Sequence, residues 1–175
     1  MKKAIQKSDV LIEALPYIQS LHNKIVVVKL GGSAMKIQKI MDGVLQDIVF
    51  LKAVGIEPIL VHGGGPYINK ELEKVGKKTS FIKGYRVTDK ETLDIVCDVS
   101  TKLSRSIVET IKKFGSDAVC TWDLDKPAVL AEKFFLNDDR NAVNDESLDL
   151  GFVGKISNVD TKTFKMLCDT GKIPV

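Results

Sequence analysis

Aromatic residues, imidazoles and long apolar runs are scarce in this sequence. Phe, Tyr and Trp make up 6% of the 175 residues, and His22 and His62 are its two histidines. No run approaches the ~20 consecutive apolar residues that a membrane-spanning helix needs. The N-terminal segment also lacks the apolar core and cleavage site of a signal peptide. We therefore expect a cytoplasmic protein that contacts no membrane.

Cysteine and net charge are also limited. The three cysteines, Cys97, Cys120 and Cys168, show no metal-ligand spacing, so we interpret them as reduced core thiols and predict no metal site. A formal net charge of +3 gives no global sign of a nucleic-acid partner. The P-loop and G-x-G-x-x-G patterns are absent, which weakens two common interpretations as a nucleotide site.

The residues that are present suit one folded domain. A content of 44% hydrophobic and 28% charged residues is ordinary for a globular chain. The β-branched run at 24–30 predicts a buried strand, the apolar stripe at 37–51 predicts a helix, and 58–61 predicts a second strand. This order predicts a right-handed βαβ unit with parallel strands.

The rest of the chain continues the alternation. Predicted elements are a helix after Pro66, a hairpin at 79–88, a long helix at 89–115, strands at 117–121, 128–131 and 151–157, a helix at 161–170, and a strand beginning at 173. We therefore predict an α/β fold with three layers, αβα, and a mainly parallel open sheet. Because a strand begins where the sequence stops, we expect a truncated chain.

The first 22 residues form a separate segment. Leu11, Leu15 and Ile18 recur at helical spacing after a cap at Ser8, and Pro16 interrupts them. We predict a kinked amphipathic helix at 1–22, outside a main domain at 23–175. The alternative is a loosely attached tail, because chain termini are often disordered.

Two glycine turns carry the first sign of chemistry. Each strand of the βαβ unit runs into glycines, Gly31-Gly32 and Gly63-Gly64-Gly65, and parallel strands deliver such turns to one edge of the sheet. Glycine allows successive N–H groups to approach an anion. Lys29 lies near the same edge, where an ammonium group would neutralise a phosphoryl group.

Each of these residues also has an ordinary structural interpretation. A glycine pair after a strand is often a plain turn, and a glycine run is often a flexible loop. Lys29 could be a solvated lysine, and His62 could serve only to shape its turn. The planar fork of Arg86 suits a carboxylate, yet an arginine in a hairpin is commonly a surface residue. From the residues alone, both interpretations stay open.

Three motifs together carry a family resemblance. Residues 28–35 (VKLGGSAM), 61–66 (VHGGGP) and 84–88 (GYRVT) resemble those of the N-acetyl-L-glutamate kinases of the amino acid kinase family, in order and spacing. Residues 149–154 are also similar to a segment of that family. The resemblance extends from about residue 11 to residue 175, and it implies the acceptor-binding N-terminal half of such an enzyme.

The resemblance implies roles for the candidate residues. The enzyme would transfer the γ-phosphoryl of ATP, bound with Mg²⁺, to the side-chain carboxylate of N-acetyl-L-glutamate in arginine biosynthesis. Lys29 would stabilise the phosphoryl group, Gly31 and Gly32 would line its path, and Gly64 and Gly65 would hold the acceptor. Arg86 would bind the acceptor's α-carboxylate.

The resemblance also implies an assembly. The segment at 14–19 is similar to an N-terminal helix that links dimers into hexamers in arginine-inhibited members, and the long helix at 89–115 is similar to the element that pairs two subunits. A homo-oligomer, at least a dimer, is therefore expected. A hexamer with arginine feedback is the further hypothesis.

The sequence departs from the family pattern in two places. Family members continue into an ATP-binding lobe that carries a second lysine, an asparagine and an aspartate without counterparts here, and residues 120–127 replace a glycine-rich turn. Three interpretations remain: a piece of a working kinase, a naturally short protein that binds the acceptor or pairs with a separate ATP lobe, or an inactive oligomerisation module. A kinase of another branch of the family is a further alternative.

Overall fold

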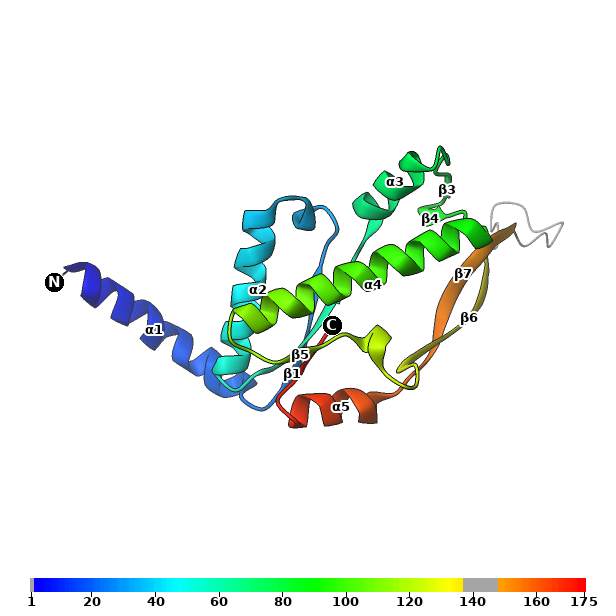
Figure 1. The fold of residues 1–175 in the computed structure, drawn as a ribbon. Coiled ribbons are helices and arrows are strands. Elements are labelled where there is room, and N and C mark those ends of the chain that lie inside the picture. Colours follow the sequence, from blue (N-terminus) through cyan, green and yellow to red (C-terminus); the bar gives the residue numbers. More distant parts are fainter. Residues whose placement is uncertain (1, 137–147) are drawn as a thin grey trace.

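The computed structural model describes residues 2–136 and 148–175 (Figure 1). Its helices are α1 (Lys2–Leu21), α2 (Gln38–Ala53), α3 (Gly65–Lys74), α4 (Lys90–Lys113) and α5 (Thr161–Asp169), with 3-10 turns at Ala34–Lys36 and Thr121–Asp123. Its strands are β1 (Ile25–Leu30), β2 (Glu57–His62), β3 (Phe81–Ile82), β4 (Tyr85–Arg86), β5 (Ala118–Val119), β6 (Val129–Leu136), β7 (Leu148–Val159) and β8 (Ile173–Pro174).

Two pairs of parallel strands form the centre of the molecule. β1 pairs with β2 from Ile25 opposite Glu57 to Leu30 opposite His62, and β5 pairs with β8. β8 lies alongside β2, which brings the two pairs together. Parallel strands need a crossover connection, and α2 supplies it between β1 and β2. The predicted βαβ unit is therefore confirmed, as is the α/β fold class.

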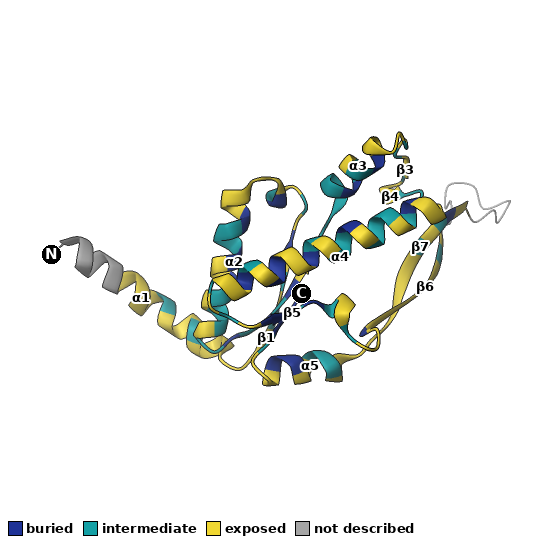
Figure 2. Cartoon of the chain, in the orientation of Figure 1, coloured by how far each residue is buried: buried dark blue, intermediate teal, exposed yellow. Residues whose placement is uncertain are grey.

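The main core lies between these strands and two helices. Alternate strand residues, such as Leu30 and Leu60, point toward α2 and α4 and are almost fully buried. They meet an apolar face of each helix, seen as dark blue stripes in Figure 2. The buried helix residues are Met41, Leu45, Ile48, Ile107, Val108 and Ile111. Burial of this apolar area is the main force that holds the layer together.

The opposite face of the strands is covered much less. Phe164 of α5 and Pro174 of β8 line one hollow together with Val27 and Ile59, so α5 lies on this second face. Val27 is 63% exposed and Val61 is 47% exposed. The three-layer αβα arrangement is present, with α5 as the third layer over part of the sheet (Figure 1).

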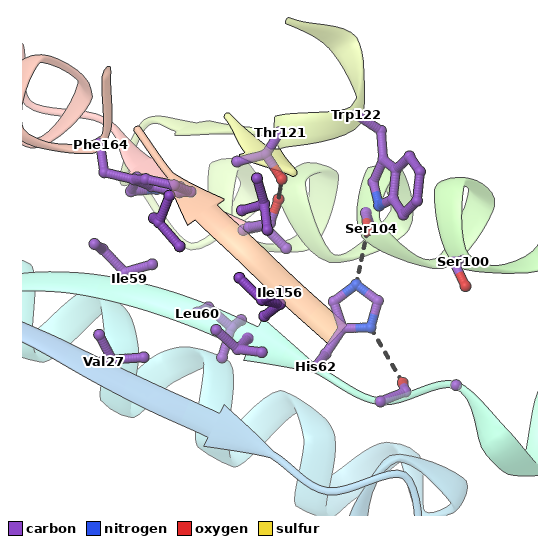
Figure 3. Close-up of a pocket in the computed structure, with 17 residues that line it drawn as sticks. Val27, Ile59, Leu60, His62, Ser100, Ser104, Thr121, Trp122, Ile156 and Phe164 are labelled. Atoms are coloured by element: carbon purple, nitrogen blue, oxygen red, sulfur yellow. Dashed lines mark hydrogen bonds between the residues drawn. The ribbon is translucent and has the colours of Figure 1, made fainter. Parts of the chain in front are cut away.

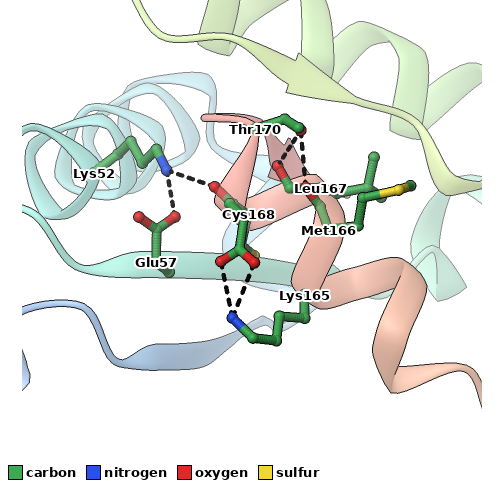
Figure 4. A network of polar contacts seen from close by, with 8 residues as sticks. Lys52, Glu57, Lys165, Met166, Leu167, Cys168 and Thr170 are labelled. Atoms are coloured by element: carbon green, nitrogen blue, oxygen red, sulfur yellow. Dashed lines mark hydrogen bonds and ion pairs between the residues drawn. The ribbon is translucent and has the colours of Figure 1, made fainter.

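A small polar network fastens α2 to α5 (Figure 4). Lys52, in the last turn of α2, forms an ion pair with Glu57 and also donates to the Cys168 carbonyl at 3.3 Å. Burial and the nearby Glu57 carboxylate raise the pKa of the Cys168 thiol. All three cysteines are free as expected, although Cys97 is only partly buried.

Of the two antiparallel strand pairs, the sequence predicted the first as a hairpin but did not predict the pairing of the second. The predicted hairpin at 79–88 is confirmed as β3 and β4, with Lys83 and Gly84 in the left-handed region at φ 48° and 86°. The strands predicted at 128–131 and 151–157 are longer than expected, and they pair with each other as β6 and β7. The strand predicted at 117–121 is reduced to β5 because a 3-10 turn begins at Thr121.

The N-terminal helix begins earlier than predicted. α1 runs continuously from Lys2, so the expected cap at Ser8 is wrong, and Pro16 lies inside the helix. Residues 2–7 include lysine, alanine and glutamine, which favour helix over a break at the serine. Figure 1 shows α1 projecting from the rest of the molecule. Among the described residues, no helix is long and apolar enough to cross a membrane.

Candidate active site

The two glycine turns meet at one edge of the sheet, as predicted. Leu30 and His62 are the last residues of β1 and β2 and lie opposite each other. The N–H of Gly63 then donates to the Leu30 carbonyl at 3.0 Å, which extends the pairing by one residue. The chain after Leu30 and the chain after His62 therefore leave the sheet side by side.

The turns pack closely against each other. A Cβ atom added to Gly63 would lie 3.4 Å from the Gly32 nitrogen. Gly64 accepts hydrogen bonds from the N–H groups of Tyr67 and Ile68, which starts α3. The positive end of a ten-residue helix, with Pro66 in its first turn, is thus directed at the sheet edge. This arrangement suits an anionic group.

Two side chains hold the turns in place. The Tyr67 hydroxyl donates to the Met35 carbonyl at 2.6 Å and so ties α3 to the segment after Gly32. His62 bonds the Gly63 carbonyl through Nδ1 at 3.1 Å and the Ser104 hydroxyl through Nε2 at 2.7 Å. A carbonyl only accepts, so in the neutral ring Nδ1 donates and Nε2 accepts from Ser104. His62 therefore shapes its turn and anchors it to α4.

Lys29 occupies the next-to-last position of β1. It lies opposite Val61 in the parallel register and is exposed. Alternation along the strand places it on the face that carries Val27, away from α2. Its ammonium group is therefore available to a ligand at the edge where the glycine turns meet.

Arg86 is the most constrained of the predicted residues. Its Nη2 donates to Asn69 Oδ1 of α3 at 2.6 Å, and its Cζ lies 4.7 Å from the centre of the Phe81 ring. Nη1 is buried and has no hydrogen-bond partner among the described residues. Burial lowers the pKa of the Arg86 guanidinium, which nevertheless stays charged at any ordinary pH. A buried donor without a partner is costly and calls for an acceptor.

A hollow lies beside this edge (Figure 3). It has a volume of about 430 Å³ and is bounded by the uncovered face of β1 and β2, the middle of α4, and side chains of β7 and α5. His62, Trp122 and Ile156 are among the lining residues labelled in Figure 3. Of the predicted site residues, only Gly64 lines it. The hollow is largely the open apolar face of the sheet, and the polar groups lie at its border.

The structure groups the predicted residues in two sets. Lys29 and the glycines of both turns share the sheet edge, whereas Arg86 approaches from the β3–β4 hairpin through its contact with α3. Sequence reasoning missed Asn69, which accepts from Arg86. It also missed Tyr67 and Ser104, which hold the two turns through the Met35 carbonyl and the His62 ring. The helical spacing of Asn69, four residues after Gly65, is the signal that places it on the helix that starts at the turn.

Metal ligands are not gathered anywhere in the described ranges. Within residues 2–136 and 148–175, no group of three or more His, Cys, Asp or Glu side chains could hold an ion. The unusual segment at 120–127 forms a short 3-10 turn, and its Trp122 is 57% exposed at the hollow. Arg105 of α4 fixes that turn through Asp123, with Nη2 and Oδ1 2.5 Å apart.

Parallel strands that end in packed glycine turns, next to the N-terminus of α3, define an α/β protein whose sheet edge is suited to an anionic group. The family comparison agrees, since residues 24–175 match the amino acid kinase family. The chain belongs to that family.

Individual relatives of this chain are acetylglutamate kinases. The chain is 44% identical to the acetylglutamate kinase of Methanocaldococcus jannaschii, over all of this chain and 59% of the relative. It is 43% identical to that of Carboxydothermus hydrogenoformans, over all of this chain and 60% of the relative. The chain thus spans about three fifths of the length of these curated relatives.

A solved structure shares the fold. N-acetylglutamate synthase from Neisseria gonorrhoeae, crystallised with coenzyme A and N-acetyl-glutamate, matches with a TM-score of 0.76. The match covers 94% of this chain and 35% of that one at 20% identity. At this identity the likeness shows the fold alone.

Proposed function

We propose that this chain forms the acceptor-binding half of an acetylglutamate kinase. The observation that carries the proposal is the meeting of two glycine turns at one strand edge, together with Arg86, which α3 holds through Asn69. The buried Nη1 of Arg86 has no hydrogen-bond partner among the described residues. The identity of 40–44% to acetylglutamate kinases over essentially the whole chain supports the choice of substrate.

The acceptor would span the distance between the two sets of residues. Arg86 would pair with the α-carboxylate of N-acetyl-L-glutamate, a charge-assisted contact that the guanidinium fork suits. Gly64 and Gly65 would present backbone groups to the rest of the molecule at the start of α3. The side-chain carboxylate would then lie at the edge where the turns meet.

The phosphoryl group would arrive at the same edge. An oxygen of the side-chain carboxylate attacks the γ-phosphorus of ATP, the bond to the β–γ bridging oxygen breaks, and ADP leaves with that electron pair. Lys29 would neutralise charge on the transferring phosphoryl group. Gly31 and Gly32 would let that group pass close to the backbone. Mg²⁺ would enter with the nucleotide, since this ion is usually bound through substrate phosphates.

Assembly and location belong to the same proposal. The exposed apolar residues of α1 include Leu11, Leu15 and Tyr17, and we propose that they join copies of the chain in a homo-oligomer in the cytoplasm, with a dimer as the unit and a hexamer as the larger form. Feedback by arginine would act through this assembly. Removal of residues 1–20 should give smaller particles by light scattering if α1 joins the dimers.

ATP-dependent formation of an acyl phosphate tests the activity. The purified chain is incubated with MgATP and N-acetyl-L-glutamate, the product is trapped with hydroxylamine, and L-glutamate and L-aspartate serve as control acceptors. Hydroxamate that forms only with N-acetyl-L-glutamate, and is abolished by Lys29→Ala, supports the kinase. Turnover with a control acceptor instead would favour another branch of the family.

A second function is binding of the acceptor without turnover. It is favoured by the single candidate lysine near the edge, since in-line transfer relies on several charge-stabilising groups. Binding of N-acetyl-L-glutamate without hydroxamate formation supports this alternative. Neither binding nor turnover would contradict both functions.

A further inference from the structure

Two neighbouring side chains hold the guanidinium of Arg86 in a fixed plane. Asn69 Oδ1 accepts from Nη2 at 2.6 Å, and the Phe81 ring stacks below Cζ at 4.7 Å. Asn69 belongs to α3 and Phe81 to β3, so the contacts come from two different elements. An arginine fork that is held at one nitrogen and on one face has little freedom to rotate.

Asn69 also sets where the fork lies relative to the glycine turn. It follows Gly65 by four residues on α3, which places it on the same side of the helix and about 6 Å further along the axis. The helix that begins at the turn therefore carries the acceptor oxygen that holds Arg86. The rigid helix α3 therefore sets the spacing between the glycine turn and the guanidinium group of Arg86.

The chemistry of an amide suits this position. An asparagine oxygen accepts a hydrogen bond but brings no charge, so the guanidinium keeps its full positive charge for a ligand. An aspartate at the same place would hold the fork equally well and neutralise it. Nη1 meanwhile is buried and meets no hydrogen-bond partner within the part of the chain that the structure describes, a costly state that an incoming carboxylate would relieve.

We propose that Asn69 is a positioning residue for carboxylate recognition: its side-chain oxygen fixes Nη2 of Arg86 so that the rest of the fork faces the acceptor's α-carboxylate. This inference rests on the proposed function. Because Nη1 is enclosed, the α-carboxylate has to displace the atoms that cover Nη1 when the acceptor binds. The bond to Asn69 keeps the guanidinium from moving away with them.

The first test needs no ligand. The sequence contains three arginines, Arg86, Arg105 and Arg140, so side-chain nitrogen NMR on ¹⁵N-arginine-labelled chain resolves Arg86 once Arg86→Lys has identified its signal. Rotation about the Nε–Cζ bond of Arg86 should be slow in the unmodified chain and in Asn69→Asp, and fast in Asn69→Ala. Lys70→Ala, an exposed neighbour on α3, should leave it slow. Equal rotation in the unmodified chain and Asn69→Ala overturns the proposal.

The second test measures binding of N-acetyl-L-glutamate by NMR titration. Asn69→Ala should weaken binding by about 10- to 100-fold, the usual effect of losing a hydrogen bond to a charged group. Asn69→Asp should bind no better than Asn69→Ala, because it neutralises the fork. In an Arg86→Lys background, Asn69→Ala should add less than about 2-fold.

The two tests separate failure of the inference from failure of the proposed function. Equal weakening by Asn69→Ala with and without Arg86 would mean a merely structural role and would overturn the inference. Wild-type binding by Asn69→Asp would contradict the charge argument. If the unmodified chain binds no N-acetyl-L-glutamate, the proposed function fails, and the rotation measurement still decides whether Asn69 holds Arg86.

Discussion

Gly32 and Pro66 belong to different glycine turns, yet a Cβ atom added to Gly32 would lie 2.9 Å from Cδ of Pro66. Side-chain carbons do not approach so closely, and a proline ring cannot rotate away. At Gly31, the preceding residue, the equivalent position has no atom of any other described residue within 4 Å, its two chain neighbours aside. One glycine of the pair is therefore required by packing and the other is not.

Gly32→Ala should destabilise the chain, because the added methyl group forces the two turns apart. We expect the free energy of unfolding to fall by about 1–3 kcal/mol, the usual cost of overpacking. Gly31→Ala is the matched control and should change it little. Urea unfolding monitored by circular dichroism measures both, and equal stability of the two variants would contradict the close packing of the turns.

Tyr67→Phe should loosen the segment after Gly32. The change removes the hydroxyl that donates to the Met35 carbonyl at 2.6 Å but preserves the ring. We expect a loss of about 0.5–1.5 kcal/mol and faster amide hydrogen exchange at Lys36 and Ile37, whose N–H groups bond within this segment. Unchanged exchange in this segment would show that the hydroxyl does not restrain it.

Lys52→Met should weaken the attachment of α5. Lys52 and Glu57 are only 16% and 21% exposed, so removal of the lysine leaves a partly buried carboxylate without its partner. We expect a loss of about 2 kcal/mol in unfolding free energy. Lys165→Met is the control, because its ion pair with Asp169 is exposed (Figure 4) and such pairs contribute little. Equal effects of the two changes would rule out a role for burial.

Asp89 should make the stability of the folded chain depend on pH. The hydrogen bond from Lys77, followed by the bond from the Thr92 N–H, lowers the pKa of Asp89 from 3.8 to about 2. A carboxylate whose pKa is lower in the folded state stabilises the fold above its unfolded pKa. That contribution disappears as the pH falls from about 4 toward 2.

The variant Asp89→Asn measures this contribution. Its melting temperature should lie below that of the unmodified chain at pH 6, and the gap should narrow between pH 4.5 and pH 2.5. Lys77→Met removes the main cause of the shift, so in that background the gap should be smaller throughout. A gap that stays constant with pH would contradict a contribution from the lowered pKa of Asp89.

The sequence allowed the centre of the fold to be predicted because each signal was local. The β-branched run of β1, the apolar stripe of α2 and the positive-φ Gly55 after it lie within one stretch of chain. The pairing of β6 with β7 was missed because residues 137–147, which lie outside the described residues, separate the two strands by more than the about two to five residues of a common hairpin loop. The start of α1 was misplaced because a serine resembles a cap even where good helix formers precede it.

The candidate site was predicted in part for the same reason. The convergence of the glycine turns follows from parallel pairing, which the βαβ order already implies. The contacts that hold Arg86 do not follow from the order of the elements, because Asn69 and Arg86 are 17 residues apart on different elements. Only the folded chain brings an α3 amide to a hairpin arginine. The roles of Lys29 and Arg86 in binding stay predictions.

Binding of N-acetyl-L-glutamate to the purified chain tests the central claim most directly. Isothermal titration should give a saturable signal for N-acetyl-L-glutamate, a weaker one for N-acetyl-L-glutamine, which lacks the side-chain carboxylate, and none for Arg86→Ala whose circular dichroism matches the unmodified chain. Absence of binding by a folded, unmodified chain, or unchanged binding by Arg86→Ala, would contradict the account of this chain as an acceptor-binding half.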